Sequence, residues 1–170
     1  RNYRNWSIGN YTAVVRHLVG TRGARVVLTG GPTDLERGYG AAIQQALGGP
    51  ANGSVINLIG QTRLKELFAI IGGADLVICP DSGPAHMATA AGVPVVGLYA
   101  TSNRHRTGPY FSQRLVVDRY PEAVQQEFGK PVEALRWGER VRDPGAMDLI
   151  GVDDVIGRID AVLDGTLRPD

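Results

Sequence analysis

The sequence predicts an α/β protein with a doubly wound, Rossmann-like parallel sheet, and two patterns lead to this prediction. Short apolar runs alternate along the chain with longer segments whose apolar residues recur at helical spacing. The apolar runs lack a polar–apolar alternation, which is typical of parallel strands covered by helices on both faces. Right-handed strand–helix–strand crossovers make this a doubly wound sheet. In such sheets ligands bind beyond the carboxyl ends of the strands.

The individual elements follow from these local patterns. Apolar runs predict strands at 25–29, 54–58, 75–79, 94–99 and 113–118. Helical spacing predicts helices at 11–19, 39–47, 64–71, 84–91 and 155–163, with weaker patterns at 121–128 and 132–137. Gly20 is expected to end the first helix. Side-chain caps are expected from Thr62, Ser82 and Asp153.

Length and composition narrow the class of protein. A chain of 170 residues is long enough for one domain with a hydrophobic core. The 18 basic and 17 acidic residues are well mixed and give a net charge of +1, which argues against nucleic acid as the main partner. Cys79 is the only cysteine and lies in an expected strand, so we interpret it as a core residue, with no disulfide or thiolate metal cluster. The three histidines lack metal-ligand spacing, and neither a metal nor another cofactor is expected.

The sequence also bears on location. No segment has the length of a transmembrane helix and no signal peptide is visible, so a cytosolic setting is expected. The polar stretch 1–6 starts abruptly, which is compatible with a piece of a longer protein.

The most informative segment runs from the expected strand at 75–79 into the helix at 84–91. Asp81 and Ser82 place two oxygen-bearing side chains at the start of this helix, and Gly83 lets a ligand approach the backbone closely. The free N–H groups and the positive dipole end of a helix bind anions. His86 falls on the first helical turn. The segment therefore predicts a phosphate site, and the alternative is a capped helix start with a satisfied histidine.

Other polar residues follow strands at the same expected sheet edge. Asp34 is placed to accept hydrogen bonds from ribose hydroxyls, with Glu36 as the rival and a helix-start carboxylate as the alternative. Thr62 precedes a helix, where a cap is the simplest role and a contact to the nucleotide base is the other. The loop at 101–109 carries Arg104 and Arg106, which either clamp a phosphate or an acidic acceptor, or lie in a solvated loop.

A family resemblance rests on several of these motifs together. They are Trp6 with a basic residue two positions earlier, Leu28-Thr-Gly-Gly31 with Asp34, Asn57-Leu-Ile-Gly-Gln-Thr62, Asp81-Ser-Gly-Pro-Ala-His86 followed by Ala88, Ala90, Gly92 and Pro94, Gly108-Pro109, and Met147. With this pattern the chain resembles the bacterial lipopolysaccharide heptosyltransferases, glycosyltransferase family nine, from about residue 4 to residue 163.

The resemblance implies a fold and an activity. It implies the carboxyl-terminal, donor-binding half of a GT-B enzyme, with 1–170 as a single nucleotide-sugar-binding domain. The amino-terminal half, which would bind the lipid-linked oligosaccharide acceptor and supply the general base, is absent from this chain. The implied reaction is inverting, metal-independent transfer from a nucleotide sugar, typically ADP-heptose. The isolated domain is then expected to bind nucleotide without turnover, in the cytoplasm, with peripheral attachment to the inner membrane as an option.

The resemblance also implies residue roles. Asp81, Ser82, Gly83 and His86 would hold the donor diphosphate and the nearby sugar. Arg4 would replace a family lysine at the phosphates, and Asp34 would contact the ribose. The chain departs from the family in two places. It has Ala100-Thr-Ser-Asn-Arg104 where a Gly-x-Thr-x-Pro motif is usual, and it lacks the cysteines that many members carry near the end.

Two other functions stay open at this stage. An epimerase-like GT-B enzyme would prefer UDP and would need catalytic acids within this half. A non-catalytic nucleotide-binding module with a degenerate site would be insensitive to replacement of Asp81 or His86.

Overall fold

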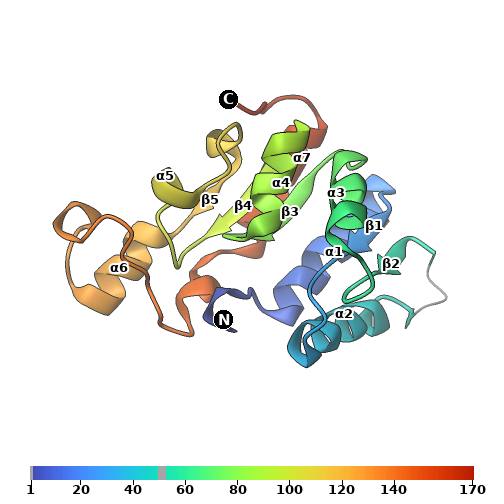
Figure 1. The fold of residues 1–170 in the computed structure, drawn as a ribbon, viewed down its shortest axis with the longest axis horizontal. Coiled ribbons are helices and arrows are strands. Elements are labelled where there is room, and N and C mark those ends of the chain that lie inside the picture. The colour runs from blue at the N-terminus through green and yellow to red at the C-terminus, as the bar shows by residue number, and fades with distance from the viewer. Residues whose placement is uncertain (1, 50–52) are drawn as a thin grey trace. The chain divides into compact units, whose positions relative to one another are not determined.

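The computed structural model describes residues 2–49 and 53–170, and these form two compact units (Figure 1). Unit 1 contains residues 2–6 and Phe68–Asp170, and unit 2 contains Ser7–Leu67. Helix α3 (Leu64–Gly72) runs from one unit into the other. All strand pairings described are parallel, so the predicted α/β class is confirmed. The strands are distributed over two sheets, one in each unit.

Unit 2 pairs two strands beside two helices. Strand β1 (Val26–Leu28) pairs in register with β2 (Val55–Asn57). The core of this unit contains Val15, Ile43 and Val55. Helix α1 (Ile8–Arg22) begins after Ser7, whose hydroxyl accepts the N–H of Asn10. It continues past the predicted end at Gly20 to Gly23, whose φ of 63° supplies the left-handed cap. Helix α2 (Asp34–Ala46) starts five residues before its predicted apolar face because Thr33 caps it.

Unit 1 carries a three-stranded parallel sheet in the order β3-β4-β5. Its strands are β3 (Val77–Pro80), β4 (Val95–Tyr99) and β5 (Val117–Asp118). All five residues of β4 are buried, as expected for the central strand of a covered sheet. Helix α4 (Gly83–Ala91) packs on β3 and β4, and α7 (Val152–Leu163) packs on β4 and β5 from the opposite face (Figure 1).

The remaining elements of unit 1 are one nine-residue helix and several single turns. They are η1 (Asn2–Arg4), α5 (Arg104–Thr107), η3 (Gln113–Leu115), α6 (Tyr120–Phe128), η4 (Val132–Ala134) and η5 (Ala146–Leu149). The predicted strand 113–118 is therefore a 3-10 turn followed by two paired residues. The predicted helix 132–137 is limited to one 3-10 turn, because the backbone becomes extended at Leu135, with φ −94° and ψ 162°. Helix α7 begins after Gly151 without a side-chain cap, so the cap predicted at Asp153 is wrong.

None of the helices within the described ranges has the length and apolar character needed to cross a membrane.

Candidate functional site

The predicted phosphate corner lies where β3 ends and α4 begins. Ser82 is extended, with φ −156° and ψ 167°, and its hydroxyl donates to the Pro80 carbonyl at 3.0 Å. It therefore does not cap α4, and the predicted Ser82 cap is wrong because the hydroxyl turns back to the strand. No side chain caps this helix. Apart from its chain neighbours and the backbone of its own helix, no heavy atom lies within 4 Å of the position that a Cβ on Gly83 would take, so the space there is open.

His86 and Asp81 face different surroundings at this corner. The His86 side chain is exposed on the first turn of α4, where a ligand can reach it. Asp81 is only 7% exposed. Its Oδ2 accepts hydrogen bonds from the Ser102 hydroxyl at 2.9 Å and from Arg140 Nη1 at 3.0 Å. Its carbonyl accepts a hydrogen bond from Arg4 Nη1 at 2.7 Å. The Asp81 carboxylate thus organises neighbouring side chains.

Sequence reasoning included Arg4 and Asp81 but missed Ser102 and Arg140. Ser102 follows β4 at the carboxyl edge of the sheet. The rule that ligands bind beyond the carboxyl ends of parallel strands would have pointed to it. Arg140 lies 59 residues after Asp81, in a stretch without regular periodicity, and no sequence signal points to it. In the structure, an isolated antiparallel bridge between Ser102 and Arg140 brings Arg140 next to Asp81.

Two other buried side chains near the corner, Cys79 and Tyr99, stay neutral. Burial raises the pKa of the Cys79 thiol to about 12, which supports its interpretation as an inert core residue. Burial also raises the pKa of Tyr99, whose hydroxyl donates to the Thr107 carbonyl at 2.9 Å. Neither group supplies an anion, so the carboxylate of Asp81 faces the guanidinium of Arg140 without a competing negative charge from these two side chains.

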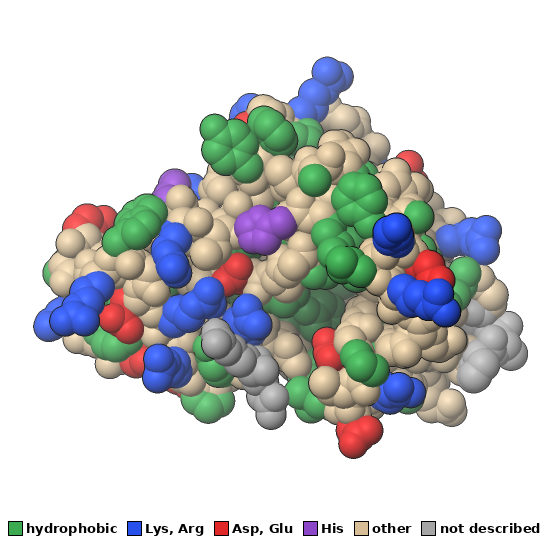
Figure 2. All heavy atoms as spheres, viewed as in Figure 1, with side chains coloured by type: hydrophobic (Ala, Val, Ile, Leu, Met, Phe, Trp, Pro, Cys, Tyr) green, Lys and Arg blue, Asp and Glu red, His purple; other side chains and the backbone are tan. Residues whose placement is uncertain are grey.

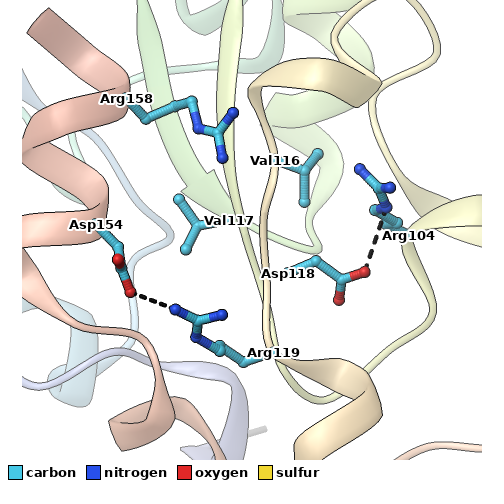
Figure 3. Close-up of a pocket in the computed structure, with 7 residues that line it drawn as sticks. All are labelled: Arg104, Val116, Val117, Asp118, Arg119, Asp154 and Arg158. Atoms are coloured by element: carbon cyan, nitrogen blue, oxygen red, sulfur yellow. Dashed lines mark hydrogen bonds and ion pairs between the residues drawn. The ribbon is translucent and has the colours of Figure 1, made fainter.

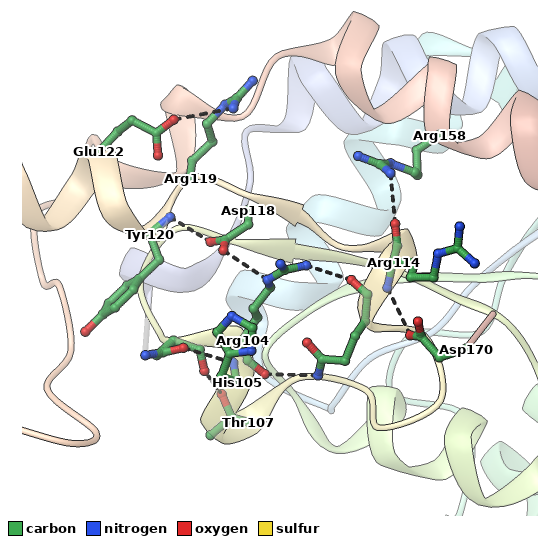
Figure 4. Close-up of polar contacts among 12 residues, drawn as sticks. Arg104, His105, Thr107, Arg114, Asp118, Arg119, Tyr120, Glu122, Arg158 and Asp170 are labelled. Carbon is green, nitrogen blue, oxygen red and sulfur yellow. Dashed lines mark hydrogen bonds and ion pairs between the residues drawn. The ribbon is translucent and has the colours of Figure 1, made fainter. Parts of the chain in front are cut away.

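The two predicted loop arginines have different environments. Arg104 Nε lies 3.2 Å from Asp118 Oδ2, and Arg104 Nη1 donates to the Gln113 carbonyl at 2.8 Å (Figure 4). Burial is the main reason why the pKa of Asp118 is raised, and its contacts with Tyr120 N and Arg104 oppose that shift. Arg104 therefore serves local structure here. Arg106 is exposed, and its guanidinium lies over Gly138, within 3 Å of the position of an added Cβ.

A separate hollow of about 280 Å³ lies along β5 (Figure 3). Its lining residues are Arg104, Val116, Val117, Asp118, Arg119, Asp154 and Arg158. Two of its three arginines are ion-paired, Arg104 with Asp118 and Arg119 with Asp154 at 2.6 Å. None of the residues of the β3–α4 corner lines it, so it is not the predicted phosphate site.

In unit 2 the structure separates the two candidate ribose acids. Thr33 caps α2, and Glu36 Oε2 accepts the Thr33 hydroxyl at 2.7 Å while its carboxylate lies against Gly31. Asp34 is the first helical residue and is exposed, with no polar partner within the described ranges. The Glu36 carboxylate is thus occupied in the turn, whereas that of Asp34 is available.

Thr62 does not cap α3. The helix begins at Leu64, and the N–H of Arg63 donates to Glu66 Oε2 at 2.7 Å. The cap position is therefore one residue later than predicted. A contact from Thr62 to a nucleotide base stays a prediction.

The fold and this corner define a Rossmann-like α/β protein with a helix start suited to an anionic ligand. Residues 1–137 match glycosyltransferase family 9 (heptosyltransferase), and the chain belongs to that family. It is 38% identical over 156 residues to the lipopolysaccharide core heptosyltransferase OpsX of Haemophilus influenzae. This match covers 92% of this chain and 44% of the relative. It is 28% identical over 161 residues to an Escherichia coli lipopolysaccharide heptosyltransferase 3, with 95% and 44% covered.

Solved structures agree on the fold. The E. coli ADP-heptose lipopolysaccharide heptosyltransferase II has a TM-score of 0.70 at 22% identity, and a family 9 glycosyltransferase from Veillonella parvula has 0.69 at 24%. Each comparison covers 96% of this chain and 43% of the solved one. The chain thus spans less than half the length of these relatives.

Proposed function

We propose that this chain binds a nucleotide-activated sugar, ADP-heptose, for transfer to a lipopolysaccharide core acceptor. The observation that carries the proposal is the uncapped start of α4, with open space over Gly83 and the guanidinium of Arg4 held on the Asp81 carbonyl. A helix N-terminus and cationic forks are complementary to a diphosphate. Family membership supports glycosyl transfer as the reaction class.

The proposed chemistry needs only a few groups from this chain. Departure of the nucleoside diphosphate builds negative charge, and preorganised N–H groups and guanidinium groups stabilise it. In the proposal these groups, and not a metal ion, do this work, and the sugar is transferred with inversion. The base that deprotonates the acceptor hydroxyl would come from the rest of a longer protein, because this chain spans 44% of its relatives. The isolated chain would then bind donor without turnover.

The acceptor and location belong to the same proposal. The relatives are named for lipopolysaccharide, so the acceptor would be a lipid-linked oligosaccharide bound by the rest of the protein. Such an acceptor would place the enzyme on the cytoplasmic side of the inner membrane, attached peripherally.

Calorimetric titration of this chain with ADP, UDP and GDP tests the donor site. We expect ADP to bind more tightly than UDP or GDP, and His86→Ala to weaken ADP binding. His105→Ala is the matched control, since His105 is also exposed in unit 1 but lies on α5. A preference for UDP would favour an epimerase-like enzyme. Absence of binding, or equal binding by both variants, would favour a module whose site is degenerate. Either result would overturn the proposal.

A further inference from the structure

Arg140 is anchored at one end of its guanidinium and open at the other. Nη1 donates to Asp81 Oδ2 at 3.0 Å, and the side chain as a whole is 23% exposed. Nε and Nη2 have no polar partner in the described part of the chain, and neither is among the buried unpartnered atoms there. The outer N–H groups of Arg140 therefore reach solvent and can bind a ligand.

The backbone on both sides of Arg140 is fixed. The preceding residue, Glu139, accepts the Tyr120 hydroxyl on its carbonyl at 2.8 Å. The following residue, Val141, is fully buried and donates its N–H to the Thr101 carbonyl at 3.1 Å. Because backbone and guanidinium are both held before a ligand arrives, little conformational entropy is lost when the outer N–H groups bind.

The charges at the corner leave a positive surplus. Arg4 and Arg140 contact the same residue, Asp81, through its carbonyl and its carboxylate respectively. One carboxylate thus stands against two guanidinium groups, beside a helix start that carries about half a positive charge. Figure 2 shows basic side chains, with acidic ones among them, over the part of unit 1 that carries α5 and α6. The ligand that this corner favours is therefore a multiply charged anion.

We propose that Arg140 binds the diphosphate of the nucleotide sugar through its outer N–H groups, and that Asp81 is the positioning residue that holds it. This inference rests on the proposed function and adds to it a phosphate-binding residue that lies beyond the predicted motifs. Arginine suits the role because its planar fork can bind Asp81 on one edge and a phosphate on the other.

The test measures binding of ADP and of adenosine to three variants of this chain. Arg140→Ala is expected to lower the ADP affinity about 10- to 100-fold, the range for losing a hydrogen bond to a charged group, while adenosine affinity stays unchanged. Arg140→Lys keeps the charge but loses the planar fork, so its ADP affinity should lie between that of the unmodified chain and that of Arg140→Ala. Arg142→Ala removes the same charge from an exposed position two residues away and should behave as wild type.

The result separates this inference from the proposed function. If the unmodified chain does not bind ADP more tightly than adenosine, the diphosphate site itself is wrong. If it does discriminate, but Arg140→Ala matches Arg142→Ala, the site stands and Arg140 is not part of it. Equal losses of ADP and adenosine affinity would show a purely structural role and would also overturn the inference. Circular dichroism of each variant verifies that the chain is folded.

Discussion

The indole N–H of Trp6 donates to the carbonyl of Ile150 at 3.1 Å, which joins two residues 144 positions apart. Trp6 is fully buried and belongs to unit 1, although α1, which begins two residues later, belongs to unit 2. The contact fixes the first turn of the chain against η5. Because Arg4 lies two residues before Trp6, the same contact also sets the position of the Arg4 guanidinium at Asp81.

Replacement of Trp6 should therefore affect both stability and binding. Trp6→Phe leaves the Ile150 carbonyl without its indole donor, and we expect a loss of about 1–3 kcal/mol in the free energy of unfolding. ADP affinity should also fall, because Arg4 loses its anchor. Urea unfolding and calorimetry provide the two measurements. Trp137→Phe is the control, since Trp137 is 71% exposed and a surface change of this kind costs less than about 0.5 kcal/mol. Equal stability of the Trp6 and Trp137 variants would contradict a stabilising role for the hydrogen bond from Trp6 to Ile150.

The network around Asp81 makes a second prediction. Ser102→Ala removes one donor to Oδ2 and should cost about 1 kcal/mol, while Asp81→Ala strands both Ser102 and Arg140 and should cost more. Since the two side chains share a hydrogen bond, the double variant should be less destabilised than the sum of the singles. A coupling of about 0.5–3 kcal/mol is expected from urea unfolding of the four proteins. Strict additivity would show that the hydrogen bond contributes nothing to stability.

The sequence predicted the frame of this corner because its signals are local. The apolar run before Asp81, the glycine at 83 and the small residues of α4 each restrict the backbone over a few positions. That was enough to place a strand, a turn and a helix in order. It was not enough to orient Ser82, because a serine hydroxyl at a helix start can bind either the helix N–H groups or a carbonyl of the preceding strand. The structure shows the second arrangement.

The parts that the sequence did not predict depend on contacts between distant segments. Arg140 reaches Asp81 because the irregular segment around it pairs with residue 102, and neither segment has a periodicity that would indicate pairing. The same holds for Arg104. Its place in the sequence predicts a position at the ligand edge of the sheet, but in the structure it pairs with Asp118. A loop arginine has several acceptors within reach, and tertiary packing decides among them.

Cys79 should be unreactive in the folded chain. Burial raises its pKa to about 12, so almost no thiolate, the reactive form, is present at pH 8. Iodoacetamide should label the native chain far more slowly than the chain in urea, where the thiol has its ordinary pKa of about 8.5. Mass spectrometry follows the label. Labelling at equal rates would mean that the β3 region opens readily.

The same shift has a consequence for stability. The folded state holds its proton up to about pH 12, whereas the unfolded state releases it near 8.5. The stabilisation from the neutral thiol is therefore complete below about pH 8.5 and is lost as the pH rises toward 12. Cys79→Ala should show a shallower loss of stability than the unmodified chain over this interval. An identical slope in the two proteins would contradict the raised pKa.

The two acids at the start of α2 should have different roles, one in stability and one in nucleotide binding. Glu36 accepts the Thr33 hydroxyl and lies against Gly31, so Glu36→Gln should lower stability by about 0.5–1.5 kcal/mol and leave nucleotide binding nearly unchanged. The sequence predicts that Asp34 contacts a ribose, where a carboxylate accepts hydroxyl hydrogen bonds. Since Asp34 is exposed, Asp34→Asn should leave stability within about 0.5 kcal/mol of wild type. Its ADP affinity should fall several-fold, while its affinity for 2′-deoxy-ADP should change little, because that ligand lacks the 2′-hydroxyl. Calorimetry with both nucleotides measures the difference, and the reverse pattern, with binding lost only in the Glu36 variant, would assign the ribose to Glu36 instead.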